Sequence, residues 1–425
     1  MTALAHGVGA QHDLPISPFY AYAGAFAALL VSFLALGLLW SDSRFRGDRS
    51  GRPLPAALQR LADARPTRTT LRSLGAAGLL ALVLALLLGP ADPEDNPAPG
   101  AVYVLLWVGL VPASLLLGPV GRLCSPLRAL SSLHRLLPPR RRPPRPLPAR
   151  LGIRPAAIGL FLFTWLELVA PDRASVTVLL SFLAAHTAVH ILGAARYGPD
   201  WFARADPFEV YSALLARLSP LGRRADGRLV LRNPLHGLDS TPPVPGLVAT
   251  VCVLLGSTAY DGFSDSPRWI AAVQTSPLGR TAAATLGLLT AVALVAALYS
   301  LCAGAVRLLS RAVTHPLTAF AHSLLPIALG YLVAHYFSLF VTEGPRTVMV
   351  ALGTDNAPAP APPLAPGGLA ALQVTAIVTG HVLGVVAAHD RSVRLFPPAR
   401  AVAGQLPLFV LMIVYTLGGI GLLIA

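Results

Sequence analysis

The side chains of this sequence best suited to chemistry are histidines set within long apolar stretches. His186 and His190 are four residues apart, so on a helix both imidazoles share one face and form half of a metal site. The other histidines in or at the edges of such stretches are His322, His335, His381 and His389. Ionisable groups at membrane depth are expensive and usually face the interior of a helix bundle or a wet cavity. We therefore treat these histidines as candidate site residues.

Carboxylates near the ends of the same stretches extend this set. Imidazole and carboxylate together suit zinc or another borderline divalent ion, which acidifies a bound water and polarises a phosphoryl or carbonyl oxygen. The predicted metal ligands are Asp261, His335, His381, His186 and His190.

Three further residues have the chemistry of catalytic groups beside such an ion. Glu167 or Asp265 would act as general base, and the hydroxyl of Tyr336 would stabilise a developing oxyanion. We expect these groups to lie near the outer ends of their helices.

Two other interpretations of the histidines stay open. They could hydrogen-bond across helices, or to backbone carbonyls, without binding anything. Paired histidines on separate membrane helices could also ligate haem axially, for which His186, His190, His335 and His381 are the candidates.

The stretch Phe320 to Phe340 shows how such groups would be positioned. It is apolar and long enough to cross a bilayer, which needs ~20 hydrophobic residues. Pro326 removes a helical hydrogen bond and clashes with the carbonyl of His322, so we predict a broken helix at this level. An irregular backbone inside a membrane needs protein or water to satisfy the freed group.

The composition places the whole chain in the membrane. Of its 425 residues 54% are hydrophobic and only 12% charged, whereas about 25% charged is usual for a soluble globular protein. We predict an all-α integral membrane protein with ten transmembrane helices. The predicted spans are Pro18 to Trp40, Leu71 to Gly89, Ala101 to Val120, Pro155 to Ala170, Ala174 to Ala194, Val244 to Gly262, Ala282 to Cys302, Thr318 to Phe340, Gly368 to Ala388 and Ala403 to Leu423.

The arginines fix the expected orientation. All 33 basic residues are arginine, and the formal net charge is +14. Apart from Arg173, Arg268, Arg280 and Arg346, they lie in the connections 41–72, 121–154, 195–243, 303–317 and 389–402. These connections share one side when the spans alternate, which is the positive-inside pattern, so both termini are expected outside.

This distribution also decides the expected partners and location. The positive charge is expected to face anionic inner-leaflet lipid, and nucleic acid is not an expected partner. The exclusive use of arginine indicates a G+C-rich coding sequence, so we expect a multi-pass protein of a bacterial plasma membrane. Cys124, Cys252 and Cys302 have no close pairing and predict neither a disulfide framework nor a CxxC site.

The ten spans can divide into two sets of five. We expect an outer N-terminal segment (1–17), a first five-helix half (18–194), an inner loop (195–243) and a second five-helix half (244–425). Because five is odd, the second half would be inverted, and Pro112 and Pro326 interrupt corresponding helices, as in transporters built from inverted repeats.

Within the inner loop a short helix is predicted to start at Asp206. Asp206 can cap it, Pro207 suits its first position, and an apolar face follows. We expect this helix to lie amphipathically in the inner interface, ending by Pro220. Asp226 and Gly227 then predict a turn followed by a short extended piece.

Fragments spread in order along the chain resemble a known family. They are AHGVG with DLP, WVGLVPAS, DPFEVYSALLARLSP, GRLVLRNP, GSTAYDGFSDS, FAHSLLPIAL, AHYFSL and GHVLGVVAAHDR. Together they resemble the actinobacterial polytopic membrane proteins commonly named fenitrothion hydrolase. The resemblance implies hydrolysis of an apolar organophosphorus ester that would partition into lipid, and it assigns no catalytic residue.

Two functions are therefore expected. The first is a membrane-embedded, metal-dependent hydrolase acting on phosphotriester bonds of an apolar small-molecule substrate. The alternative is a transporter or permease for a metal ion or small solute, with a histidine-lined central site and histidines relaying protons.

Overall fold

The computed structural model describes residues 18–132, 144–309, 315–354, 363–397 and 400–424. Within them, ten helices are long and apolar enough to cross a membrane, which confirms the predicted all-α polytopic fold and its ten spans. The expected outer segment 1–17 lies outside the described residues. The ten helices are Phe19–Leu39, Arg65–Leu88, Pro97–Leu117, Ala149–Leu168, Val176–Tyr197, Leu247–Ser264, Arg280–Arg307, Pro316–Ala351, Pro366–Leu395 and Ala401–Leu422.

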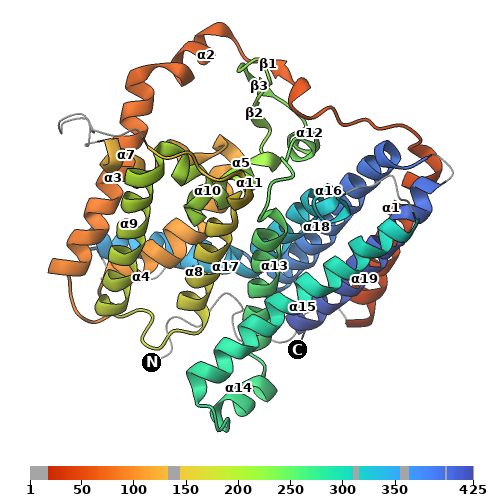
Figure 1. Cartoon of the computed structure of the whole chain (residues 1–425). Helices are drawn as coiled ribbons and strands as arrows, with labels where there is room; N and C mark the ends of the chain where they lie inside the picture. Colours follow the sequence, from red (N-terminus) through yellow and green to blue (C-terminus); the bar gives the residue numbers. More distant parts are fainter. Residues whose placement is uncertain (1–17, 133–143, 310–314, 355–362, 398–399, 425) are drawn as a thin grey trace. The chain divides into compact units, whose positions relative to one another are not determined.

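The chain forms two compact units that differ from the expected halves. Unit 1 takes the described residues within 1–47, 238–341 and 362–425, and unit 2 takes those within 48–237 and 342–361. The first span therefore belongs with the late helices, and six spans lie wholly or mainly in unit 1 and four in unit 2. Figure 1 labels the elements and colours the chain by residue number, so the elements of each unit can be found in it.

Unit 1 is a bundle of long helices. Short helical segments lie between α13 and α15 and before α17. α13 packs on α15, α18 packs on α19, and α1 packs against both α18 and α19. Small side chains form one part of its core, where Ala21, Ala25, Ala334, Ile377 and Ile420 are buried together. Its elements are α1 (Pro18–Leu39), α13 (Leu247–Ser264), α14 (Pro267–Gln274), α15 (Arg280–Leu309), α16 (Pro316–Phe320), η7 (Ala321–Leu324), the first part of α17 (Leu325–Ala351), α18 (Pro366–Leu395) and α19 (Ala401–Ile424).

The predicted break near Pro326 is present. α16 ends at Phe320, a tight 3₁₀ turn covers residues 321–324, and α17 begins at Leu325. Pro326 has no amide hydrogen to donate to the carbonyl of His322. That carbonyl instead accepts a hydrogen bond from the Leu325 amide. The freed group is thus satisfied inside the protein, as a membrane segment requires.

Unit 2 combines four spans with short helices and a small sheet. Its second span begins with α4 and continues as a π-helix, η2, in which the Gly109 amide donates to the Val104 carbonyl at 2.9 Å. The predicted turn is present, with Gly227 at φ 82° between the antiparallel strands β2 and β3. The elements are β1 (Arg52–Pro53), α2 (Ala56–Asp63), α3 (Arg65–Leu88), α4 (Pro97–Gly100), η2 (Ala101–Val108), α5 (Leu110–Leu117), α6 (Val120–Leu123), α7 (Pro126–Ser132), η4 (Ala149–Leu151), α8 (Arg154–Leu168), α9 (Val176–Tyr197), η5 (Pro199–Trp201), α10 (Phe202–Ala205), α11 (Pro207–Leu215), η6 (Ala216–Leu218), β2 (Leu221–Arg223) and β3 (Leu229–Leu231); η1 (Gly47–Arg49) and α12 (Pro234–Asp239) straddle the unit boundaries.

The short helix of the inner loop is α11, and its surroundings correct the prediction. Its start is as predicted, because the Asp206 side chain accepts hydrogen bonds from the amides of Phe208 and Glu209, with Pro207 in the first turn. The predicted amphipathic exposure is wrong, because eight of its nine residues are buried, including Glu209. Its location at the inner interface of the membrane stays a prediction. α11 packs against α5, α6 and α8 and so forms part of the core of unit 2.

Candidate functional site

Three polar side chains from two helices meet inside unit 1. Asp261 lies one turn before the end of α13, and His335 and Tyr336 are adjacent on α17. Oδ2 of Asp261 is 2.6 Å from Nε2 of His335 and accepts a hydrogen bond from the Tyr336 hydroxyl at 2.9 Å. The three residues are only 1%, 4% and 3% exposed. We refer to these residues as the Asp261 cluster.

The local sequence explains how the Asp261 cluster is assembled. Neighbouring residues on an α-helix are about 100° apart, so the adjacent His335 and Tyr336 approach one carboxylate oxygen from two directions. Their rings are 4.8 Å apart and nearly perpendicular, at 89°. α13 lies close to α15 at Gly256, where a side chain would collide with the backbone of Val292.

The electrostatics of the cluster depend on its burial. A carboxylate removed from water is costly unless charged or hydrogen-bonding partners compensate it. Asp261 receives two such partners, and the charge of the exposed Asp265 also acts on the His335 imidazole. The arrangement can hold a proton on the imidazole or on the carboxylate, and moving that proton alters both hydrogen bonds.

His381 has a different environment from the one predicted. Its Nδ1 is 2.9 Å from the Ile377 carbonyl of its own helix, and its ring lies 5.6 Å from that of Tyr331 and 6.3 Å from that of Tyr415. Its Nε2 is buried and has no hydrogen-bond partner among the described residues.

The predicted metal ligands do not form a shared site. Among the residues that the structure describes, no three His, Cys, Asp or Glu side chains are grouped to hold one ion. Within the Asp261 cluster, the carboxylate oxygen nearest the imidazole already accepts from two donors. Zinc binding therefore stays a prediction without a fitting ligand set, and the haem alternative likewise stays a prediction.

The remaining candidates belong to unit 2. Glu167 is buried on α8 and acts electrostatically on Tyr103 and Tyr211. His186 and His190 share one face of α9 as expected, with ring centroids 4.4 Å apart. His186 also contacts the rings of Phe182 and Phe208, so its near surroundings are largely aromatic.

A buried ion pair in unit 2 was not predicted. Arg128 of α7 donates two hydrogen bonds of 2.7 Å to the two carboxylate oxygens of Glu209. The side chains are only 11% and 2% exposed. The signal available in the sequence was Glu209 itself, an acidic residue among apolar ones, but nothing pointed to Arg128 among the many arginines.

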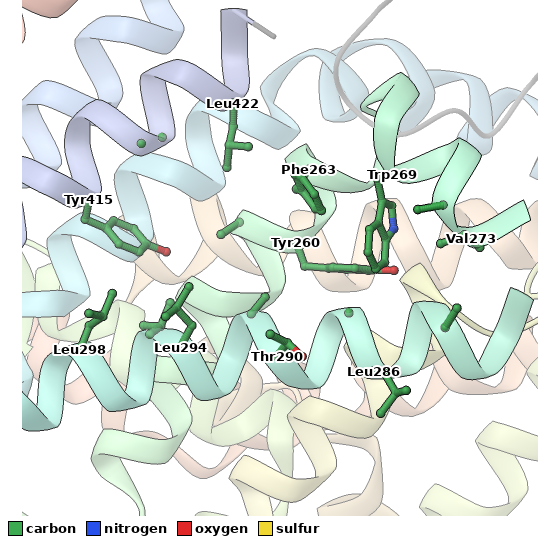
Figure 2. A pocket seen from close by; sticks show the side chains of 18 of the residues that line it. Tyr260, Phe263, Trp269, Val273, Leu286, Thr290, Leu294, Leu298, Tyr415 and Leu422 are labelled. Atoms are coloured by element: carbon green, nitrogen blue, oxygen red, sulfur yellow. The ribbon is translucent and has the colours of Figure 1, made fainter. Parts of the chain in front are cut away.

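An apolar groove of about 690 Å³ opens beside the helices that carry the Asp261 cluster. Tyr260 and Phe263 of α13 line it, as does Tyr331 of α17, while neither Asp261 nor His335 does. Figure 2 shows Leu286, Thr290, Leu294 and Leu298 of α15 along one side and Leu422 of α19 on the other. Tyr260 lies beside Trp269 at one end, and Tyr415 lies at the other.

The fold and the buried polar cluster define a class: a polytopic α-helical membrane protein with ionisable groups inside its spans. Comparisons of the chain with models of protein families, with curated proteins and with solved structures each find no match.

Proposed function

We propose that the protein is a proton-coupled membrane transporter in which Asp261 carries the proton. The observation that supports this is the Asp261 cluster, a carboxylate inside a membrane span that accepts from both an imidazole and a phenol. Chains of Asp, Glu and His within spans are typical of proton relays in pumps and transporters. The transported solute is a small molecule or ion whose movement is linked to that proton.

The chemistry follows from the two states of Asp261. As a carboxylate it accepts from Tyr336 and pairs with His335; when protonated it becomes a donor and no longer needs both partners. Protonation therefore loosens the link between α13 and α17. Because α17 begins at the break beside Pro326, it has a defined point about which such a change could be accommodated.

The experiment is proton movement in proteoliposomes that contain a pH-sensitive dye and carry an imposed membrane potential. Asp261→Asn keeps the size of the side chain and removes its titration, so proton flux should fall to that of protein-free liposomes. Asp92→Asn, an exposed change in unit 2, should leave the flux unchanged.

A second measurement tests protonation of Asp261 directly. A hydrophobic carbodiimide reacts with protonated carboxyls inside membranes, so peptide mass spectrometry should find Asp261 labelled, and more strongly at lower pH. If Asp261 is not labelled at any pH and the asparagine variant retains full flux, the transporter proposal is overturned.

The apolar groove favours a second candidate, hydrolysis of an apolar organophosphorus ester. A lipophilic ester could enter the groove from the bilayer, and the resemblance to proteins named fenitrothion hydrolase points the same way. Tyr260 lines the groove directly before Asp261, so in this candidate α13 would have to turn by about 100° to bring the carboxylate to bound substrate. Asp261 with His335 would then activate the attacking water as general base.

This candidate is tested with a dialkyl nitrophenyl phosphate and purified protein in lipid nanodiscs. Hydrolysis should depend on Asp261, and Leu294→Trp, which fills the groove, should abolish it without changing the melting temperature. Nitrophenolate release equal to that of empty nanodiscs would exclude this activity toward the probe and leave transport as the remaining proposal.

A further inference from the structure

Unit 2 contains a cavity that the proposed function does not use. It measures about 550 Å³ and lies between α3, η2, α6, α7, α9 and α11, with the last turns of α17. Ligand pockets for small molecules usually fall between ~300 and ~1,000 Å³ and combine an apolar lining with a few polar groups. Here most of the lining is apolar, and its polar or ionisable side chains are those of Cys124, Ser125, His186, Asp206, Glu209 and Thr347.

Asp206 provides a buried carboxylate in the lining of this cavity. Its side chain caps α11, accepting from the amides of Phe208 and Glu209 at 2.9 and 3.2 Å. Both bonds use Oδ1, so the cap does not require Oδ2. Asp206 is only 5% exposed and lines the cavity. A buried carboxylate therefore lines a largely apolar space.

The neighbouring charges leave Asp206 under-compensated. Glu209 is neutralised by Arg128 through two short hydrogen bonds. His190, a group of opposite potential charge, interacts electrostatically with Asp206, and the charge of Glu209 also acts on it. Burial raises the pKa of Asp206 above its ordinary value, so its charged form lacks full compensation in this structure. A positive group in the cavity would supply that compensation.

The cavity is bordered by a helix, α3, whose other side chains are largely exposed. α3 is mostly exposed along its length, and its Leu74, Leu80 and Leu84 present large apolar side chains on the surface. Gly78 of the same helix lines the cavity and has open space where a side chain would lie. A ligand dissolved in the bilayer could therefore enter beside α3.

We propose that this cavity binds a lipophilic amine, with the ammonium on Asp206 and the hydrocarbon body between α3 and α9. An anionic amphiphile fits poorly, because no arginine lines the cavity among the described residues and Arg128 is already committed to Glu209. A neutral amphiphile would fill the apolar part but leave the carboxylate uncompensated. The site lies within unit 2 and is independent of Asp261.

The test uses the full chain in nanodiscs of zwitterionic phosphatidylcholine, with dodecylamine carrying a diazirine as the probe. Illumination followed by peptide mass spectrometry should place the label on α3 and α9. Unlabelled dodecylamine should compete, whereas dodecanol should compete weakly and dodecanoate not at all.

The matched variant is Asp206→Asn. Asparagine caps a helix about as well as aspartate, so the fold is kept while the charge is removed. Competition by dodecylamine should weaken by about tenfold or more, as expected for loss of one charge-assisted hydrogen bond, and competition by dodecanol should stay the same. Asp92→Asn, at an exposed site, should change neither.

A second variant covers the case in which Asp206→Asn fails to fold. Leu82→Trp fills the apolar part of the cavity and should remove labelling by the amine without touching the cap. If the three probes compete equally, or if both folded variants label as the wild type does, the label reports partitioning into the bilayer and the proposal is overturned. Neither result would bear on proton flux through Asp261.

Discussion

Two buried carboxylates in this protein have partners of different kinds. Asp261 is held by an imidazole and a phenol, both of which are groups that can donate and accept protons. Glu209 is held by a guanidinium, which stays protonated under all ordinary conditions. The partners of Asp261 can therefore themselves lose or gain a proton, whereas the partner of Glu209 stays charged.

Removing Glu209 should show this structural role directly. Glu209→Gln leaves Arg128 mostly buried without a counter-charge, and breaking a buried pair by removing one partner costs about 3–5 kcal/mol. We expect a marked fall in the melting temperature in detergent, measured by near-ultraviolet circular dichroism. The double change Arg128→Leu with Glu209→Leu should recover much of the loss, because it removes the uncompensated charge as well.

The exposed pair of Arg224 and Asp226 supplies the control. It lies at the turn before β3, where solvent screens the charges. Asp226→Asn should therefore leave the melting temperature nearly unchanged. A loss as large as that of Glu209→Gln would mean that burial does not decide the strength of these pairs.

At the scale of elements, the positions of the helices along the chain could be predicted from the sequence. The rotation of each helix about its own axis, which decides the face it packs against its neighbours, could not. Hydropathy and length gave the ten spans, Pro326 gave the break before α17, and Asp206 gave the start of α11, because each depends on local chemistry. The face that a helix turns toward its neighbours depends on packing across the bundle. His381 was therefore placed in the cluster from its depth alone, although its ring lies beside Tyr331 and Tyr415.

The contact between α17 and α18 explains this outcome. A side chain at Gly380 would come within 2.5 Å of the Pro326 carbonyl oxygen, and one at Gly330 within 2.6 Å of the Ala376 carbonyl oxygen. The glycines let the two backbones approach closely, as small residues do in membrane bundles. This approach fixes the rotation of α18, and His381, one position beyond Gly380, is turned about 100° away from the contact.

Substituting Gly380 should separate the two helices. Gly380→Ala places a methyl group against backbone atoms that cannot move aside, and overpacking of this kind costs about 1–3 kcal/mol. We expect a lower melting temperature. Gly418→Ala on α19 has open space around the new side chain, so stability should be equal or slightly higher because alanine favours helix. Equal stability of both variants would contradict a close contact at Gly380.

For the whole molecule, the chain order proved a poor guide to grouping. The expected halves followed the sequence, yet α1 packs with the last helices, where Phe33 stacks on Phe409 with centroids 4.0 Å apart. Asp390 of α18 also accepts hydrogen bonds from Trp40 and Ser43, at and just after the end of α1. Such contacts join residues some 350 positions apart, and no local pattern in the sequence predicts them.

The arginine distribution also predicts the orientation of the whole molecule in the membrane. Cysteines substituted for two exposed aspartates can test this orientation. Asp92 lies in a connection poor in arginine, whereas Asp226 lies in one of the arginine-rich connections, and both are exposed. In a background without Cys124, Cys252 and Cys302, we expect a membrane-impermeant maleimide to label Asp92→Cys on intact cells. Asp226→Cys should be labelled only after the membrane is opened.

The energy needed to translocate charge determines the expected orientation. Each arginine near a span resists crossing toward the outside, and the cytoplasmic leaflet attracts it by about 1 kcal/mol. The crowding of nearly all 33 arginines into alternate connections should therefore bias the chain strongly toward one orientation. Labelling of Asp226→Cys but not Asp92→Cys on intact cells would reverse the orientation. Labelling of both would mean that the chain inserts in two orientations, so that its arginine distribution no longer decides the sides of the loops.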